Sequence, residues 1–244
     1  MRILCIGNSF SQDATRYLHQ IAESAGEEME VWNLFVGGCS LEWHWQNIQD
    51  RAEEYLLEIN GESTERKVDA VAMLEQEEWD VVTLQQVSNK SVDYPSYQPY
   101  LEKINTVIRE KAPSAKRMIH QTWAYEQGCV RLDKELGGRI RQEMFRDLEK
   151  AYEQAAADIA ADGIIPSGAV FEAIQSETSY KMHRDGYHAS LGLGRYALGL
   201  TWYGYLTGKP VREISFDCLD EEVSAEALER VRGIAERILK VRRP

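Results

Sequence analysis

The chain has 244 residues and a formal net charge of -12, from 40 acidic and 28 basic side chains. Such an excess of negative charge repels a nucleic-acid backbone and an anionic membrane surface, so we expect neither as a partner. The longest apolar stretches are only as long as a strand, and we therefore expect no transmembrane span, no signal peptide and a cytoplasmic location.

Five strand-like runs alternate with helical patterns along the chain. The runs are Arg2 to Ile6, Met29 to Phe35, Trp79 to Leu84, Arg117 to Gln121 and Gly163 to Val170. Between them, apolar residues recur at three- and four-residue spacing, which is typical of helices. This alternation predicts an α/β protein, a three-layer α/β/α sandwich with a five-stranded parallel sheet. No linker or shift in composition divides the chain, so we predict one domain over residues 1–244.

Ser9 directly follows the first strand-like run, where a sharp turn leads into a helical pattern. Parallel sheets bind ligands at the carboxyl ends of their strands, and Ser9 lies at such an end. A serine there could cap the helix, but Ser11 and Asp13 stand closer to the periodic part and can cap it instead. Ser9 is therefore a candidate nucleophile, although the motif is not the GxSxG elbow of α/β-hydrolases.

Asp185 and His188 stand three residues apart, just before another helical pattern. On a loop, this spacing allows the carboxylate to orient the imidazole as a general base. The alternative is a capping Asp beside a partly buried His, and the motif alone favours neither interpretation. His183 is a competing base, but no acidic residue stands three positions before it.

The four cysteines are spread along the chain without a CxxC pair or neighbouring histidines. Their spacing predicts neither a zinc site nor a disulfide scaffold. Cys39 follows a Gly-Gly turn and is a candidate reactive thiol, but no base stands beside it. Because the chain has neither a ligand cluster nor a glycine-rich dinucleotide motif, we expect no metal and no organic cofactor.

Taken together, the two polar motifs resemble those of the SGNH (GDSL-like) hydrolases. Members of that family carry Gly-Asp-Ser near the N-terminus and Asp-x-x-His near the C-terminus, on a flavodoxin-like sheet. Residues 7–9 match the first block with Asn in place of Asp, and residues 185–188 match the last block. The resemblance implies a carboxylic ester hydrolase in which Ser9 is the nucleophile, His188 the base and Asp185 the residue that orients the base.

The same resemblance implies an oxyanion hole built from the middle of the chain. The family has a functional glycine after its second strand, where this chain has Gly37 and Gly38; we choose Gly38, with Gly37 as the alternative. After the third strand the family has Gly-x-Asn-Asp, which places Asn89 at the Asn. The family's glycine is missing at this point, so the side-chain amide of Gln85 or Gln86 could donate instead.

Aromatic residues follow two of the predicted strands, and Trp43 and Trp123 are the ones we expect to bind substrate. Aromatic rings offer rigid apolar faces, which favours a small carbohydrate ester, such as an O-acetylated sugar, over a long-chain lipid. The alternative is that each ring packs against a helix edge. Two other functions fit the motifs: a non-catalytic module that binds an anion or a sugar, and an acyltransferase with the same nucleophile.

Overall fold

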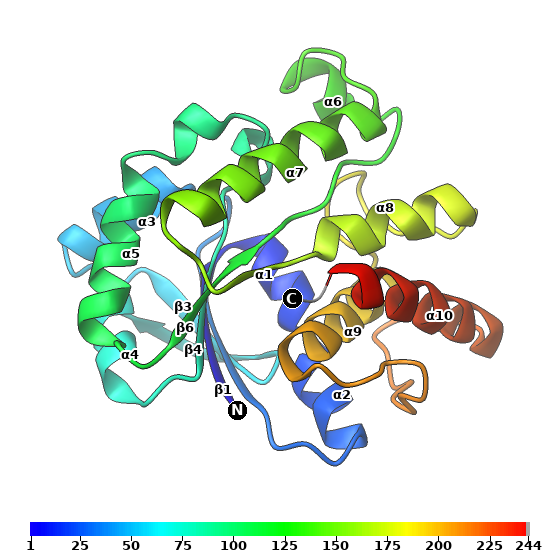
Figure 1. The fold of residues 1–244 in the computed structure, drawn as a ribbon, viewed down its shortest axis with the longest axis horizontal. Coiled ribbons are helices and arrows are strands. Elements are labelled where there is room, and N and C mark those ends of the chain that lie inside the picture. Colours follow the sequence, from blue (N-terminus) through cyan, green and yellow to red (C-terminus); the bar gives the residue numbers. More distant parts are fainter. Residues whose placement is uncertain (243–244) are drawn as a thin grey trace.

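The computed structural model describes residues 1–242. Within them, seven strands form one sheet in the order β4-β3-β2-β1-β5-β6-β7, with helices on both faces (Figure 1). The strands are β1 Arg2–Gly7, β2 Glu30–Phe35, β3 Tyr55–Ile59, β4 Glu62–Val68, β5 Val81–Leu84, β6 Lys116–His120 and β7 Gly163–Ile165. The predicted fold class, a central sheet flanked by helices, is confirmed.

The five predicted strands are all present and form the parallel part of the sheet. β1 pairs with β2 on one side and with β5 on the other, and β6 and β7 follow β5 outward. The side chains from Ile3 to Ile6 in β1 are at most 1% exposed, because helices cover both faces of the sheet. The last predicted run was too long, since its strand ends at Ile165 and Pro166 leads into helix α8.

The prediction of a five-stranded sheet missed the hairpin of β3 and β4. β3 pairs antiparallel with β2, and β4 pairs antiparallel with β3, so the sheet is mixed. β4 has the sequence ESTERKV and exposes most of its side chains to water. An exposed, charged edge strand lacks the apolar pattern by which buried strands are found in a sequence.

The helices form two layers around the sheet. Their bounds are α1 Ser9–Thr15, α2 Leu18–Ser24, α3 Leu41–Gln49, α4 Ala70–Gln76, α5 Tyr100–Lys111, α6 Val130–Lys134, α7 Arg141–Asp158, α8 Ser167–Glu177, α9 Leu193–Thr207 and α10 Ala225–Arg242. One layer has α9 at its centre, in contact with α1, α2, α8 and α10, and the other contains α3, α4, α5 and α7 (Figure 1). No helix within residues 1–242 is long and apolar enough to cross a bilayer.

The turn after β1 lies where the strand order reverses, because the chain continues to β2 on one side and to β5 on the other. This is the position at which open α/β sheets bind ligands. Gly7 ends β1, and a Cβ atom at Gly7 would lie 2.2 Å from Ser11 Oγ, so the close approach of α1 requires glycine. The fold thus brings the turn of Ser9 beside the turns that follow β2 and β5.

Candidate active site

The N-terminus of α1 is capped by Asn8 and not by any of the residues considered from the sequence. Asn8 Oδ1 accepts a hydrogen bond of 3.0 Å from the backbone N–H of Phe10. The prediction that Ser11 or Asp13 caps this helix is therefore wrong, because both are buried and bonded elsewhere. The Ser9 hydroxyl, at the first position of the helix, is not needed as a cap.

The Asp-x-x-His motif lies on a short loop that is closed by a β-bridge between His183 and Ala189. Within the loop, Asp185 Oδ1 accepts hydrogen bonds from the backbone N–H groups of Tyr187 (3.2 Å) and His188 (2.9 Å). These bonds fold the loop tightly around the carboxylate. The imidazole and the carboxylate consequently lie on the same side of the loop.

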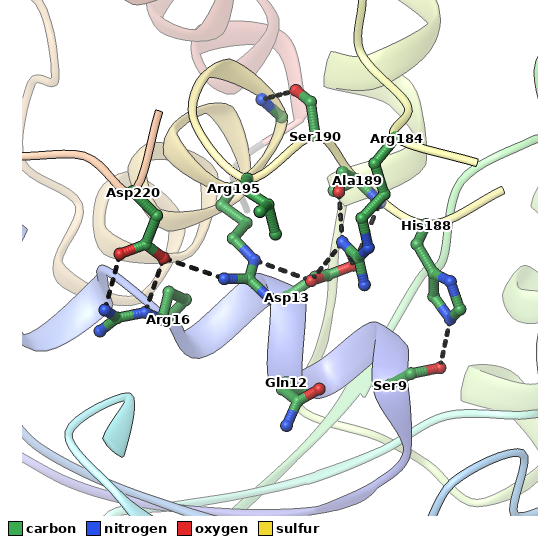
Figure 2. Close-up of polar contacts among 12 residues, drawn as sticks. Ser9, Gln12, Asp13, Arg16, Arg184, His188, Ala189, Ser190, Arg195 and Asp220 are labelled. Atoms are coloured by element: carbon green, nitrogen blue, oxygen red, sulfur yellow. Dashed lines mark hydrogen bonds and ion pairs between the residues drawn. The ribbon is translucent and has the colours of Figure 1, made fainter. Parts of the chain in front are cut away.

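Three side chains predicted from the sequence form one hydrogen-bonded line. Ser9 Oγ lies 2.8 Å from His188 Nε2, across a sequence separation of 179 residues (Figure 2). His188 Nδ1 lies 2.7 Å from Asp185 Oδ2. In this arrangement a neutral imidazole protonated at Nδ1 can accept the proton of the Ser9 hydroxyl, as a general base must.

The electrostatics of the loop keep the carboxylate ionised. Partial burial raises the pKa of Asp185, but the hydrogen bonds from the His188 side chain and from the backbone N–H groups of His188 and Tyr187 outweigh it and hold the pKa below its usual value. An ionised carboxylate beside Nδ1 stabilises the imidazolium that forms when His188 takes a proton. The line can therefore support nucleophilic attack by Ser9.

Trp123 is buried beneath the loop that carries Asp185 and His188, and its ring does not face the solvent. Its side chain is 0% exposed, it stacks on Phe10 with ring centroids 4.2 Å apart, and its Nε1–H donates to Tyr187 O at 2.9 Å. The prediction that Trp123 binds substrate is wrong, because a fully buried ring has no face to offer. Trp43, in α3, is 48% exposed and so can contact a ligand.

His183 and Cys39 are both buried and cannot replace the proposed base and nucleophile. Burial lowers the pKa of His183 to about 4, and its Nε2 lies 3.0 Å from Ala124 O. Burial raises the pKa of the Cys39 thiol, so the thiol stays protonated at neutral pH. Among residues 1–242, no group of three or more His, Cys, Asp or Glu side chains could hold a metal ion.

The turn after β2 is tied to the turn of Ser9. Asn8 Nδ2 donates to Cys39 O at 2.9 Å, a bond that a carboxylate at position 8 could not make unless protonated. Gly38 precedes Cys39 with φ +65, exposed to solvent. Its backbone N–H donates to no other residue in the described part of the chain. Gly38 is therefore available as a donor next to the turn of Ser9.

Asn89 follows β5 in the 3-10 turn Ser88–Lys90 and is exposed. Its side chain makes no hydrogen bond within residues 1–242, so its amide is free to donate. The neighbouring Gln86 is different, because its Nε2 already donates to Ser96 O at 3.0 Å and to Ser96 Oγ at 3.2 Å. The prediction of Gln86 as an oxyanion donor is wrong, since its side chain is fully buried and holds the turn after β5.

The side chain of Gln85 also makes hydrogen bonds within the protein, and these bonds support the cap of α1. Gln85 Nε2 donates to Asn8 Oδ1 at 2.8 Å, and Gln85 Oε1 is hydrogen-bonded to His120 Nδ1. Burial lowers the pKa of His120 to about 3, so this imidazole is neutral and donates through Nδ1. Neutral groups at the ends of β6 and β5 thus orient Asn8, and the Gln85 side chain is buried, 3% exposed, and holds the cap of α1.

Sequence reasoning missed the charged cluster behind the site. Asp13 is 0% exposed and accepts hydrogen bonds from Arg184 and Arg195, both distant in sequence (Figure 2). The available signal was weak: Asp13 stands four residues after Ser9, on a helix face otherwise occupied by buried residues such as Phe10. A charged residue in that position requires partners, but its spacing does not identify them.

Comparisons with known proteins place this chain in a family. The family model described as "Domain of unknown function (DUF4886)" matches residues 2–236. A solved DUF4886 family protein from Bacteroides uniformis ATCC 8492 is 34% identical, with a TM-score of 0.92 over 98% of this chain and 95% of that chain. This chain belongs to the DUF4886 family. No curated protein sequence matches it significantly.

Two further structures relate the DUF4886 chain to the SGNH hydrolases. A provisional SGNH hydrolase from Slackia heliotrinireducens is 27% identical, with a TM-score of 0.62 over 84% of this chain and 98% of that chain. Axe2, an acetylxylan esterase from Geobacillus stearothermophilus, is 16% identical, with a TM-score of 0.50 over 91% of this chain and 97% of that chain. The DUF4886 chain therefore has an SGNH-hydrolase-like fold.

Proposed function

We propose that this protein is a serine esterase that hydrolyses short-chain acyl esters through Ser9, His188 and Asp185. The observation that carries the proposal is the continuous hydrogen-bonded line from the Ser9 hydroxyl through both nitrogens of His188 to the Asp185 carboxylate. The SGNH-hydrolase-like fold supports a hydrolase as the broader class. A binding module would have no use for a base aligned with a serine hydroxyl.

The reaction begins with attack of Ser9 Oγ on the ester carbonyl carbon while His188 Nε2 takes the hydroxyl proton. The tetrahedral intermediate then collapses, the carbon–oxygen bond to the alcohol breaks, and His188 returns the proton to the leaving alcohol. The Asp185 carboxylate stabilises the imidazolium between these steps. Water, activated by the same imidazole, attacks the acyl-enzyme and releases the acid.

Negative charge develops on the carbonyl oxygen in both steps, and donors must face it. We assign this role to the backbone N–H groups of Ser9 and Gly38 and to the side-chain amide of Asn89. The unpaired Gly38 N–H and the free, exposed Asn89 amide support the assignment. Loss of one such donor typically lowers kcat by about 100- to 1000-fold.

For the substrate, we propose an O-acetyl group on a carbohydrate. The main support for this substrate class is the exposed ring of Trp43, five residues after Gly38. The half-buried Tyr187 also lies beside the base, but His188 (ring centroids 3.9 Å apart) and the guanidinium of Arg131 (3.9 Å) pack against its ring, so Trp43 offers the exposed ring surface. Such surfaces suit a rigid sugar ring better than a flexible acyl chain.

The first test is hydrolysis of p-nitrophenyl acetate and butyrate by the wild type, Ser9→Ala and His188→Ala, with circular dichroism to verify folding. We expect each variant to lose activity by about 10⁴-fold or more. Ser215→Ala, which changes an exposed serine, is the matched control and keeps wild-type activity. A fluorophosphonate probe should label Ser9 in the wild type, as located by mass spectrometry.

The outcomes separate the candidate functions. An inactive but folded wild type that the probe does not label, or an active Ser9→Ala, contradicts the proposal and favours a binding module.

Faster release of acetate from an acetylated xylo-oligosaccharide than of palmitate from its p-nitrophenyl ester supports the substrate class, and the reverse order contradicts it. Acetyl transfer to an added free sugar in preference to water would make the protein an acyltransferase.

A further inference from the structure

We propose that Asp13 is a positioning residue that sets the distance between Ser9 and His188. The inference rests on the proposed function for its catalytic consequence, but its structural part stands on contacts of its own. Asp13 and Ser9 lie on the same short helix, α1, four residues and about one turn apart. Whatever holds Asp13 therefore also holds Ser9.

All the hydrogen bonds of the Asp13 carboxylate go to the other half of the site. Arg184 Nη1 donates to both carboxylate oxygens at 2.9 Å, and the backbone N–H of Ala189 donates to Oδ2 at 3.1 Å. Arg195 Nε, from α9, donates to Oδ1 at 2.8 Å. One carboxylate thus joins α1, the loop of residues 183–189 and α9 (Figure 2).

The contacts of Asp13 hold the loop on both sides of residues 185–188. Arg184 precedes Asp185 directly, and Ala189 follows His188 directly. Arg184 also closes the loop on itself, because its backbone N–H donates to His188 O at 3.1 Å and its guanidinium donates to Ala189 O. A shift of Asp13 relative to this loop would consequently move the imidazole relative to the Ser9 hydroxyl.

Burial requires the Asp13 carboxylate to keep these partners. Asp13 is 0% exposed, and a buried carboxylate is tolerated only when it is paired and hydrogen-bonded. Two guanidinium groups and one backbone N–H meet that requirement here. Apolar side chains of similar volume often stabilise a fold as well as a buried ion pair does, but they lack directional bonds. Directional bonds can fix the distance between the Ser9 hydroxyl and the His188 imidazole. This distance matters because a misplacement of reacting groups by about 1 Å can lower the reaction rate about 100-fold.

The same cluster contains a second carboxylate, that of Asp220, which serves as a control for Asp13. Arg195 Nη1 also donates to Asp220 at 3.0 Å, and Asp220 accepts two hydrogen bonds from Arg16, at 2.9 Å and 2.8 Å. Asp220 is therefore a second carboxylate of the cluster, but within residues 1–242 it makes no hydrogen bond or ion pair with the loop of residues 183–189. Asp220→Asn perturbs the cluster without touching His188.

The experiment compares Asp13→Asn with Asp220→Asn. For each, kcat, KM and the pH profile on p-nitrophenyl acetate are measured, together with hydrogen–deuterium exchange of residues 184–190 by mass spectrometry. We expect kcat of Asp13→Asn to fall by about 100-fold with little change in KM. The acid limb of its pH profile should shift, and the loop should exchange faster. Asp220→Asn should keep the kcat, pH profile and exchange of the wild type.

A pair of variants at Arg184 keeps the test valid if Asp13→Asn does not fold. Arg184→Met should lower kcat and speed exchange of the loop, and Arg184→Lys, which keeps the charge opposite Asp13, should recover part of both losses. Unchanged kcat and exchange in folded Asp13→Asn or in Arg184→Met overturns the proposal. Equal effects in Asp220→Asn also overturn it, because they indicate a purely structural cluster.

The exchange measurement separates this proposal from the proposed function. If the wild type hydrolyses no ester, the proposed function fails, while faster exchange of the loop in Asp13→Asn alone still supports the positioning contact. If the wild type is an active esterase and neither kcat nor exchange responds to Asp13→Asn, the proposed function stands and the positioning role fails.

Discussion

The two sides of the candidate site are built from different chemical groups. On the side of His188, charged residues hold the geometry: Asp185 pairs with the imidazole, and Asp13 is paired with Arg184 behind it. On the side of Gly38 and Asn89, the turns are held by neutral amides, namely those of Asn8, Gln85 and Gln86.

This difference follows from the charge that each side must face. An imidazole that takes a proton becomes a cation, which a carboxylate stabilises. The opposite side would face an oxyanion, and a buried carboxylate there would repel it. Neutral amides avoid this repulsion, and each can also donate and accept at once, as Asn8 does toward Cys39 O and the Phe10 N–H. In the proposed reaction, the paired carboxylates of Asp185 and Asp13 therefore lie on the side that becomes cationic.

The largest effect should come from neutralising the charged side with Asp185→Asn. The amide can present its NH₂ to His188 Nδ1 and favour the tautomer that cannot accept the Ser9 proton, so we expect kcat to fall by about 10⁴-fold. Because the pKa of Asp185 is held below its usual value, the wild type keeps its ionised partner for His188 at mildly acidic pH. The measurement is kcat on p-nitrophenyl acetate from pH 5 to 8, with exposed Asp217→Asn as the control. Near-wild-type kcat would show that the carboxylate is dispensable.

A smaller effect should follow from adding charge to the amide side with Asn8→Asp. The side chain at position 8 is 1% exposed, and an ionised carboxylate cannot donate to Cys39 O. We expect a loss of about 1 to 3 kcal/mol in the free energy of unfolding at neutral pH. Burial raises the pKa of the new carboxyl, so the loss should shrink at low pH, where the protonated group can donate, and grow as the pH rises through that pKa.

Urea unfolding of Asn8→Asp at pH 5 and at pH 8 checks this sign. Asn89→Asp, the same substitution at an exposed residue without partners, serves as the control and should leave stability unchanged. A loss that is equal at both pH values would contradict the argument from charge, and equal stability of Asn8→Asp and the wild type would show that the bond to Cys39 O contributes little.

The smallest effect should come from Gly38→Ala, which changes no polar group. Gly38 has φ +65, so an alanine there is strained by about 1 kcal/mol from its backbone alone. A Cβ atom would meet nothing within 4 Å, so no steric clash adds to this value. Gly37→Ala, where φ is not positive and the nearest atom is Phe35 Cζ at 3.7 Å, is the matched control. Equal stability of the two variants in urea would contradict the backbone argument.

The sequence predicted the parts of the molecule that depend on local patterns. Ser9 follows a buried strand, and Asp185 and His188 are only three residues apart, so their placement follows from short motifs and the parallel topology. The connection of Asp13 to Arg184 joins residues 171 positions apart, and nothing local indicates it. The prediction of Gln86 as an oxyanion donor was wrong for a related reason. The end of a strand can be located in the sequence, but the direction and the hydrogen-bond partners of its side chains cannot.

Burial is the second property that the sequence could not provide. Trp43 and Trp123 each follow a predicted strand, yet one is 48% exposed and the other is 0% exposed. The difference arises because Trp123 is enclosed by Phe10, Phe171 and the loop that carries His188. Tertiary packing decides this outcome, and the position of each residue along its own segment does not.

The antiparallel hairpin of β3 and β4 also affects how the protein meets other copies of itself. A sheet edge is a template on which another chain can add a strand, and charged or very short edge strands discourage such pairing. One edge here is β4, with the sequence ESTERKV, and the other is the three-residue β7, whose Ile164 N–H already donates to the Tyr205 hydroxyl at 3.1 Å. Without the hairpin, the edge would be β2, with its buried Val31 and Leu34. The polar hairpin thus protects an apolar sheet from edge-to-edge aggregation.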